Sequence, residues 1–403
     1  MPRLVQINTT AGRGSTGKIA RRIATLAGQA GWECFVAHGA RYAGPPDSGA
    51  FQVSGRAGEL GHFLGSCLLD RHGLGSACAT KRLIAHLKEV APDVVQIHNL
   101  HGYYAHYELL LRFLAAEGIP TVITLHDFWL MTGHCAYINS SCARWETGCG
   151  NCPRLKEYPA ALVDRSGKNW ALKRELVEAF DPEKLVIVPV SHWLEAFAKR
   201  SLLGDRRICT IQNGVDTQLF RPCEGEHSAL WKQIDWRKYT LLTVADRWTE
   251  ANGFQDIVAL SHLLPEDMQI VMVGLTGRQL QGLPDKIVGV GHTDNVQQLI
   301  ELYSSADVLL NASREVTFGL VTAEAMACGT PAIVLRHTAG EEIIDAETGF
   351  AIDAVREIPP LVRACREKAG AFKQACRRRI VENFDAEKQY AKYVALYNRL
   401  IGA

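Results

Sequence analysis

The sequence lacks the features of a membrane-inserted or exported protein. None of its 403 residues falls in a run that approaches the roughly 18 consecutive apolar residues of a membrane-spanning helix. The N-terminus, Met1-Pro2-Arg3-Leu4, leads directly into a strand-like segment, without the apolar core of a signal peptide. We therefore expect the protein in the cytoplasm.

The sequence also has almost no net charge. Its 44 Lys and Arg residues face 43 Asp and Glu residues, which leaves a formal charge of +1. Electrostatics over the whole chain therefore gives no attraction to nucleic acid, and we expect no nucleic-acid partner. Hydrophobic residues make up 47% and charged residues 22%, as in folded globular proteins, so the composition excludes global disorder and fibrous repeats.

Short β-branched segments alternate with helical segments, which is the pattern of a parallel sheet covered by helices. In the first half of the chain we expect strands at residues 4–7, 34–37, 94–97, 122–124 and 186–190. The alternation restarts after the turn-forming Asn213-Gly214. In the second half we expect strands at residues 241–244, 270–273, 287–290, 308–310 and 332–335.

These patterns predict the α/β fold class, with two Rossmann-like domains. We place the N-terminal domain at residues 1–205 and the C-terminal domain at 206–380, followed by a helix at 381–403 that packs back on the N-terminal domain. Ligands of open parallel sheets bind at the carboxyl ends of the strands. We therefore expect a site in a cleft between two facing domains.

The first predicted strand ends in a glycine-rich loop, Gly12-Arg13-Gly14-Ser15-Thr16-Gly17-Lys18. Its spacing matches a P-loop, whose backbone N–H groups hold phosphates. The next residue is Ile19, where a P-loop has the Ser or Thr that binds Mg²⁺, and this disfavours a P-loop-like NTPase. The loop either approaches a ligand phosphate without a metal or is a tight turn with no ligand.

A second glycine loop follows the predicted strand at 308–310 and brings two carboxylates, Glu315 and Glu324. Gly319 lets the backbone approach a ligand, and the helix after it would direct its N-terminal dipole at an anion. The carboxylates would repel a bare phosphate but accept hydrogen bonds from hydroxyls. The combination favours a sugar nucleotide, whereas each glutamate alone is typical of a solvated surface.

At these residues the sequence resembles glycosyltransferase family 4, whose members have the two-domain GT-B fold. The core of the resemblance is Phe318-Gly319-Leu320 followed by Glu324-Ala325-Met326-Ala327-Cys328-Gly329-Thr330-Pro331. Other segments match in order: Gly14-Ser15-Thr16-Gly17, Thr124-Leu125-His126-Asp127, Asn213-Gly214-Val215-Asp216, Val273-Gly274 and Thr348-Gly349-Phe350.

The resemblance implies a hexosyltransferase that moves a sugar from a nucleotide-diphosphate sugar, with retention of the anomeric configuration. A UDP-sugar is the first expectation and a GDP-sugar the second, with a glycan, a lipid-linked precursor or a small molecule as acceptor. No cofactor is implied for catalysis, because an arginine and a helix dipole can stabilise the leaving diphosphate without a metal.

The resemblance also implies roles for individual residues. Glu324 looks like the glutamate that holds the ribose, and Glu315 like the one near the reacting carbon of the donor sugar. His126 resembles a histidine that faces the donor sugar, although a packed, hydrogen-bonded histidine is the alternative. We take His126 and Glu315 as catalytic candidates. The donor-binding candidates are Gly14, Arg247, Asn252, Gly274, Thr317, Phe318, Gly319, Leu320, Val321 and Glu324.

Two positions depart from the family pattern. Eight residues separate Glu315 from Glu324, against the usual seven, so Val316 occupies the in-register position. Asn252 stands where the family usually has lysine, which removes a charge-assisted contact to the diphosphate worth roughly 1.5–3 kcal/mol. These departures motivate the alternative of a non-catalytic nucleotide-sugar-binding subunit.

Four cysteines lie close together at residues 134–153, namely Cys135, Cys142, Cys149 and Cys152. Four thiolates can hold one structural zinc. Free thiols and disulfides are the other two alternatives, the latter disfavoured in a cytosolic chain. A similar insert occurs in bacterial family members that build surface polysaccharides, which favours such glycans or their lipid-linked precursors as acceptors.

The segment His98-Asn99-Leu100-His101-Gly102-Tyr103 follows a predicted strand. Histidines and tyrosines in loops at strand ends suit hydrogen bonding and stacking to a sugar. We take Ser15, His98, His101 and Tyr103 as acceptor-binding candidates. Lys and Arg residues also give the C-terminal helices a basic bias, which is either a solvated face or a peripheral contact with the inner face of the membrane.

Overall fold

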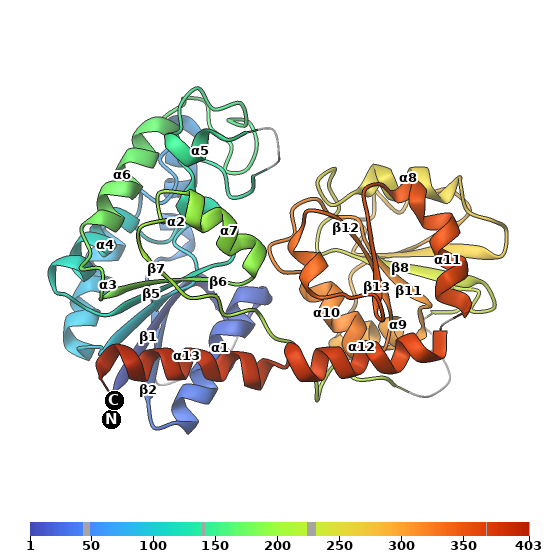
Figure 1. Ribbon diagram of the computed structural model, residues 1–403. Helices are drawn as coiled ribbons and strands as arrows, with labels where there is room; N and C mark the ends of the chain where they lie inside the picture. The colour runs from blue at the N-terminus through green and yellow to red at the C-terminus, as the bar shows by residue number, and fades with distance from the viewer. Residues whose placement is uncertain (43–48, 139–141, 224–230, 368, 403) are drawn as a thin grey trace. The chain divides into compact units, whose positions relative to one another are not determined.

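The computed structural model describes residues 1–42, 49–138, 142–223, 231–367 and 369–402 (Figure 1). They form two compact units, Met1–Gln212 with Gln389–Ala403, and Asn213–Lys388. The boundaries thus lie at 212/213 and 388/389, against 205/206 and 380/381 in the sequence-based prediction. Among the described residues no helix is both long and apolar enough to cross a membrane.

The first unit is built on a parallel sheet of seven strands in the order β3-β2-β1-β4-β5-β6-β7. Its strands are β1 (Arg3–Ala11), β2 (Glu33–Tyr42), β3 (Ala50–Gln52), β4 (Val94–Ile97), β5 (Thr121–Leu125), β6 (Leu185–Pro189) and β7 (Arg207–Ile208). The strand order reverses between β1 and β4, so their carboxyl ends form the crevice where ligands of such sheets bind.

Helices cover both faces of this sheet (Figure 1). The helices of this unit are α1 (Gly14–Gln29), α2 (Arg56–Leu69), α3 (Ala77–Val90), α4 (Tyr107–Ala116), α5 (Arg144–Thr147), α6 (Ser166–Glu178), α7 (His192–Arg200) and, from Gln389 onwards, α13 (Ala386–Ile401). Helix α13 is tied to the sheet through the Tyr397 hydroxyl, which donates to Gln96 Oε1 at 2.5 Å. The Trp32 indole also donates to the Asn398 side chain at 3.1 Å.

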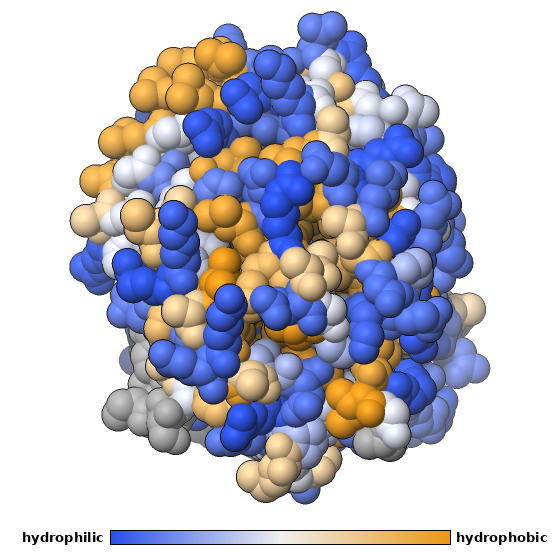
Figure 2. Space-filling view, turned by 90° about the vertical axis from the view of Figure 1, so that its left-hand side faces the viewer, coloured by the Kyte–Doolittle hydropathy of each residue, from blue (hydrophilic) through white to orange (hydrophobic). Residues whose placement is uncertain are grey.

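Apolar side chains also reach the surface of the molecule. On the face drawn in Figure 2, most of the surface is polar, but apolar side chains gather at its upper left. Helix α2 alone exposes five large apolar side chains, those of Leu60, Phe63, Leu64, Leu68 and Leu69. The apolar residues of the first unit are therefore not confined to its core.

The second unit repeats the arrangement with a parallel sheet of six strands in the order β10-β9-β8-β11-β12-β13. Its strands are β8 (Tyr239–Val244), β9 (Met268–Val273), β10 (Ile287–Val290), β11 (Val308–Asn311), β12 (Ala332–Leu335) and β13 (Gly349–Ile352). Its helices are α8 (Phe254–Ser261), α9 (Val296–Ser305), α10 (Leu320–Ala327), α11 (Ile358–Glu367) and α12 (Ala369–Asn383).

Apolar strands buried on both faces form the core of each unit. In β4, β5 and β6 every residue is buried, as expected for strands with helices on either side. In the second unit, side chains of β8 and β9 pack with Ile257, Leu260 and Val308 in one hydrophobic cluster. The predicted α/β class with two Rossmann-like sheets is confirmed.

Candidate active site

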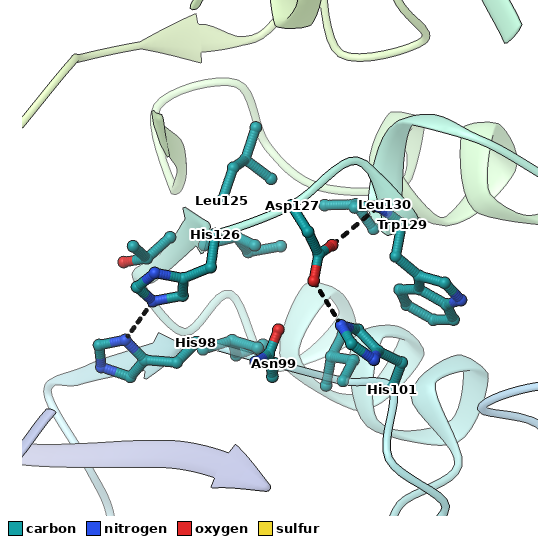
Figure 3. Close-up of a pocket in the computed structure, with 12 residues that line it drawn as sticks. His98, Asn99, His101, Leu125, His126, Asp127, Trp129 and Leu130 are labelled. Atoms are coloured by element: carbon teal, nitrogen blue, oxygen red, sulfur yellow. Dashed lines mark hydrogen bonds and ion pairs between the residues drawn. The ribbon is translucent and has the colours of Figure 1, made fainter. Parts of the chain in front are cut away.

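A pocket of about 300 Å³ lies in the first unit at the carboxyl ends of the neighbouring strands β4 and β5 (Figure 3). Residues 97–101, 123–127, 129 and 130 line it. The structure thus brings together three predicted site residues, His98, His101 and His126, from loops 28 residues apart in the sequence. Because parallel strands end at the same edge, their following loops meet.

His98 and His126 form one pair across the pocket (Figure 3). His98 Nδ1 lies 3.1 Å from His126 Nε2, and the two rings are close to parallel, with their centroids 5.4 Å apart. The other ring nitrogen of His98, Nε2, lies 2.8 Å from Gln6 Oε1. Burial lowers the pKa of His98 well below its usual value and that of His126 to about 4. Both imidazoles are therefore neutral at pH 7.

His101 and Asp127 form the second pair. His101 Nε2 donates to Asp127 Oδ2 at 2.6 Å, and Asp127 Oδ1 accepts from the Trp129 backbone N–H at 2.9 Å. Burial raises the pKa of Asp127, but its contacts with His101 more than offset this and the pKa falls below its ordinary value. Asp127 is thus a carboxylate that fixes the orientation of His101. In the sequence, Asp127 stood out only as part of a motif and had no predicted role of its own.

The third predicted acceptor residue of this loop, Tyr103, lies outside the pocket lining. Its φ is +71°, and its ring packs against His72 and Phe63, with centroids 4.9 and 5.2 Å away. His72 in turn contacts the rings of His101, Trp129 and Tyr158. Tyr103 therefore belongs to an aromatic cluster beside the pocket.

The loop after β1 carries Gly14 and Ser15, both exposed. Gly14 has φ +68° and begins α1, whose N-terminus has no side-chain cap. At Gly17 an added Cβ would lie 2.9 Å from the Thr10 hydroxyl, so the turn admits no side chain there. The uncapped N–H groups remain available to a ligand at the switch point of this sheet.

In the second unit, predicted donor residues gather at the ends of β8 and β9. Arg247 lies exposed in the loop after β8. The neighbouring Trp248 indole donates to the Val273 carbonyl at 2.8 Å, which holds this loop against the end of β9. Gly274 has φ +93°, and a Cβ there would lie 1.7 Å from the Ala245 carbonyl oxygen. This close approach of two strand ends requires glycine.

The loop after β11 lies beside the loop after β8. The Arg314 backbone N–H donates to the Ala251 carbonyl at 3.0 Å, and the Arg314 guanidinium pairs with Asp256 at 2.7 Å. The Thr249 hydroxyl donates to Asn252 Oδ1 at 2.7 Å, so the amide that replaces the family's lysine helps to order its own turn. The order of strands reverses between β8 and β11, which makes this the ligand crevice of the second sheet.

Glu324 lies on α10, whose N-cap is Gly319 with φ +100°. The buried Tyr303 hydroxyl donates to Glu324 Oε2 at 3.1 Å. Burial raises the pKa of Tyr303 above its ordinary value, and Glu324 raises it further. Among the other predicted donor residues, Phe318 is buried, whereas Thr317, Leu320 and Val321 are half-buried around the helix start.

At the position of the family's first glutamate, the structure places Val316 and Glu315 in different surroundings. Val316 is buried and its carbonyl accepts from the Ala339 N–H at 3.1 Å. Glu315 is half-buried, and its N–H donates to the Ser313 hydroxyl at 3.4 Å. The in-register position therefore faces the core, and Glu315 is the carboxylate that stays near the surface.

The four clustered cysteines, all free thiols, line one cavity of about 350 Å³. Cys135 donates a hydrogen bond to Cys152, and this lowers the pKa of Cys152 to about 6. Buried His134 lines the same cavity, and its Nδ1 lies 2.6 Å from Asp70 Oδ1. In the part of the chain that the structure describes, no three His, Cys, Asp or Glu side chains are arranged to hold a metal ion. Structural zinc stays a prediction.

Arginines of the C-terminal helices form hydrogen bonds and ion pairs within the second unit. Arg377 donates to the carbonyls of Phe220, Ala327 and Thr217 at 2.6–3.1 Å. Arg379 pairs with Asp345 at 2.7 Å, and Arg366 with Asp267 at 2.7 Å. These guanidiniums stabilise the fold and give no support to a membrane contact.

Two family models match the chain. One, "Glycosyltransferase Family 4", matches residues 17–219, and the other, "Glycosyl transferases group 1", matches residues 239–367. The first spans half of the chain. The chain belongs to glycosyltransferase family 4.

Among the relatives of this family 4 chain is the putative colanic acid biosynthesis glycosyl transferase WcaC of Escherichia coli (strain K12). The two are 27% identical over 288 residues, which are 65% of this chain and 64% of WcaC. The chain thus matches less than two thirds of the length of that relative.

Two solved structures confirm the GT-B fold. Sucrose-phosphate synthase from Thermosynechococcus elongatus superposes with a TM-score of 0.73 at 17% identity, over all of both chains. Anabaena Alr3699/HepE, in complex with UDP, superposes with a TM-score of 0.65 at 15% identity, over 99% of this chain and 100% of the other. At such identities the likeness concerns the fold alone.

Proposed function

We propose that this family 4 protein is a retaining hexosyltransferase that uses a UDP-sugar and a glycan or lipid-linked acceptor. The observation that carries the proposal is the crevice between β8 and β11. It combines an exposed arginine, a glycine helix start and a carboxylate held by a buried tyrosine. The UDP bound to HepE supports the donor, and the colanic acid biosynthesis for which WcaC is named supports the acceptor class.

Each part of the crevice suits one part of a sugar nucleotide. Glu324 can accept hydrogen bonds from the ribose hydroxyls, and the Tyr303 hydroxyl orients it from behind. The start of α10 and Arg247 would face the diphosphate and stabilise the negative charge that develops as it leaves. Glu315, beside this helix start, is the carboxylate nearest the sugar in this assignment. No step of this scheme calls on a metal.

In this proposal the pocket at the ends of β4 and β5 binds the reacting sugars. His126 and His101 present imidazoles there, and Asp127 holds His101 in one orientation. Imidazoles are suited to the hydroxyl groups of sugar rings, because they form hydrogen bonds with them. In the aromatic cluster beside the pocket, Trp129 is buried, whereas Tyr103 is half-buried and Tyr158 is exposed, so an acceptor sugar can pack on the two tyrosines.

The test is release of UDP from a panel of UDP-sugars, each with and without membrane-extracted acceptor, followed by NMR of the anomeric proton in the product. We expect release that depends on one sugar, a product with retained configuration, and no dependence on magnesium. Turnover with GDP-sugars only would correct the donor. Binding of UDP-sugars without any transfer would favour the non-catalytic subunit.

A further inference from the structure

Helix α2 packs on the first unit with its polar side and directs apolar side chains outward. Its buried residues are His62 and Ser66. His62 Nε2 accepts from the Gly73 and Gly75 backbone N–H groups at 3.1 and 3.0 Å, and the Ser66 hydroxyl donates to the His62 carbonyl at 2.9 Å. A helix on the surface of a globular domain normally has the opposite orientation, with its apolar side toward the core. The core of the first unit therefore does not explain the apolar residues of α2.

The outward side of α2 is formed by five large apolar side chains. Leu60, Leu64 and Leu68 recur every four residues, so they lie in one row along the helix. They are 59%, 52% and 52% exposed, and Phe63 and Leu69 are exposed beside them. Soluble proteins seldom expose such a continuous apolar area unless it contacts a partner.

The loop at residues 158–163 extends this area. The Leu162 backbone N–H donates to the Cys67 carbonyl at 2.8 Å, which holds the loop against α2. Leu162 is 76% exposed, and Val163 next to it is also exposed. We call the five outward side chains of α2, together with Leu162 and Val163, the apolar face.

The apolar face adjoins the pocket at the ends of β4 and β5. The ring centroid of Phe63 lies 5.2 Å from that of Tyr103. The ring centroid of Tyr158, at the start of the loop, lies 6.2 Å from that of His101, which lines the pocket. An acceptor whose sugar occupies the pocket can therefore have an apolar part beside this face.

Basic side chains flank both segments of the apolar face. Three exposed ones are Arg56, Arg71 and Lys156. The acidic side chains of these segments are each hydrogen-bonded within the fold, namely Glu59, Asp70, Glu157 and Asp164. The charges that can reach from the edge of the face toward a partner are therefore positive, and they favour an anionic surface.

The side chains of the face favour a lipid partner over a protein. The exposed positions of residues 60–69 are all leucine, phenylalanine or glycine, and this stretch has no Asp, Glu, Lys or Arg. Protein interfaces carry about one hydrogen bond per 100–200 Å², which such side chains cannot supply. The hydrocarbon of a bilayer requires no hydrogen bond from them. A helix that lies in the plane of a membrane places its apolar side in the boundary between headgroups and acyl chains.

We infer that the apolar face docks on a lipid bilayer with anionic headgroups. Its leucines would enter the hydrocarbon boundary, while Arg56, Arg71 and Lys156 reach the phosphate groups. The inference deepens the proposed function and rests on it for the acceptor, which would be lipid-linked, with its sugar in the pocket and its hydrocarbon chain in the bilayer. Binding to the bilayer itself does not depend on the proposed function.

The test is flotation of the purified protein with vesicles of phosphatidylcholine and phosphatidylglycerol. We expect the wild-type protein to float with the vesicles. Leu64→Gln/Leu68→Gln should bind about 10-fold or more weakly, because these two side chains no longer gain from leaving water. The matched control is Leu263→Gln, because Leu263 is 54% exposed but lies in the second unit. It should bind as the wild-type protein does.

A second arm tests the charges. Vesicles of phosphatidylcholine alone should bind the wild-type protein about 5-fold or more weakly than the mixed vesicles, since each basic residue near anionic lipid contributes an effect of about that size. Arg56→Gln/Lys156→Gln should remove most of this difference. Unchanged melting temperatures of the variants show that they remain folded.

Three results would overturn the inference. The first is wild-type protein that stays unbound with the mixed vesicles, and the second is equal binding by Leu64→Gln/Leu68→Gln and Leu263→Gln. The third is a wild-type dimer in analytical ultracentrifugation that Leu64→Gln/Leu68→Gln dissociates, because the face would then bind a second copy of the chain. Flotation that depends on the leucines, without any transfer of sugar, would count against the proposed function alone.

Discussion

His101 Nε2 lies 2.6 Å from a carboxylate oxygen of Asp127, and both side chains are only 13–14% exposed. The two residues follow neighbouring strands and point toward one another in the pocket (Figure 3). His101 Nδ1 is directed toward the Tyr158 hydroxyl at 3.4 Å. The Asp127 carboxylate therefore fixes the orientation of the His101 ring in the pocket.

Replacing Asp127 by Asn tests this pair while keeping its shape. The charge-assisted bond to His101 becomes a neutral one, and we expect kcat/KM for the acceptor to fall by about 10- to 100-fold, from roughly 1.5–3 kcal/mol. UDP binding should not change, because no predicted donor residue of the second unit is altered. An Asp127→Asn enzyme with full activity would exclude the pair from the acceptor site.

The lowered pKa of Asp127 also predicts how the free energy of unfolding depends on pH, and comparison of the wild-type protein with Asp127→Asn tests this. Burial raises the folded-state pKa of Asp127, but His101 more than offsets this, so the pKa lies below its ordinary value. A depressed carboxylate pKa contributes stability above the unfolded-state pKa, and this stability is lost as the pH falls through the folded-state pKa. Melting curves of the two proteins should therefore differ most above about pH 4 and converge in more acidic solution. A gap that widens on acidification would contradict this sign.

Glu324 and His126 should separate donor binding from turnover. Glu324→Ala should abolish UDP binding, because it removes the proposed ribose contact, whereas His126→Ala should mainly lower kcat. Tyr303→Phe removes the hydroxyl that donates to Glu324 at 3.1 Å. We expect it to raise the dissociation constant for UDP by about 3- to 10-fold, the effect of roughly 0.5–1.5 kcal/mol. Isothermal titration with UDP measures the dissociation constant of each of the three variants, and the UDP-release assay measures kcat of His126→Ala.

Gly274 should tolerate no side chain. A Cβ there would lie 1.7 Å from the Ala245 carbonyl oxygen at a φ of +93°, so Gly274→Ala must push the ends of β8 and β9 apart. We expect a loss of about 2 kcal/mol or more in unfolding free energy. The control is Gly277→Ala in the same loop, where an added Cβ meets nothing within 4 Å. Equal melting temperatures of the two variants would contradict the close approach.

Cys152 should be the reactive thiol of its cluster. Its hydrogen bond from Cys135 lowers its pKa to about 6, and burial raises the pKa of Cys149 to about 11. Iodoacetamide reacts with thiolates, so metal-free protein should be alkylated first at Cys152 near pH 7, and more slowly as the pH falls below about 6. Peptide mass spectrometry identifies the site, and preferential labelling of Cys149 would contradict the assignment.

The zinc hypothesis needs a separate measurement. The four thiols line one cavity with His134, whose buried Nε2 has no hydrogen-bond partner among the described residues. A bound zinc would use such donors, and the Asp70 contact would orient the imidazole. The hypothesis predicts about one equivalent of zinc by elemental analysis of protein purified without chelator. Less than about a tenth of an equivalent would reject it.

The buried strands could be predicted from the sequence because each is a short run of β-branched residues, which local composition reveals. The predicted segments at 94–97 and 287–290 coincide with β4 and β10. It missed β3, β7 and β13, which have three, two and four residues and lie at the sheet edges. Such short edge strands carry little periodicity, and their place depends on the strands beside them.

The site was predictable as a set of residues but not as a set of contacts. The motif around His126 and the loop from His98 to Tyr103 were both identified, yet the pairing of His101 with Asp127 depends on β4 lying beside β5. The support of His98 by Gln6 spans 92 residues of sequence. Contacts of this kind follow from strand order, which local patterns do not specify.

The most direct test of the proposed donor site is binding of UDP to the purified protein without magnesium, followed as a shift in melting temperature. Ligand that binds only the native state raises the melting temperature. We expect stabilisation by UDP in wild-type protein, unchanged by magnesium and absent in Glu324→Ala. Stabilisation by ATP alone, and only with magnesium, would contradict the proposed donor site and favour the glycine loop after β1 as the nucleotide site.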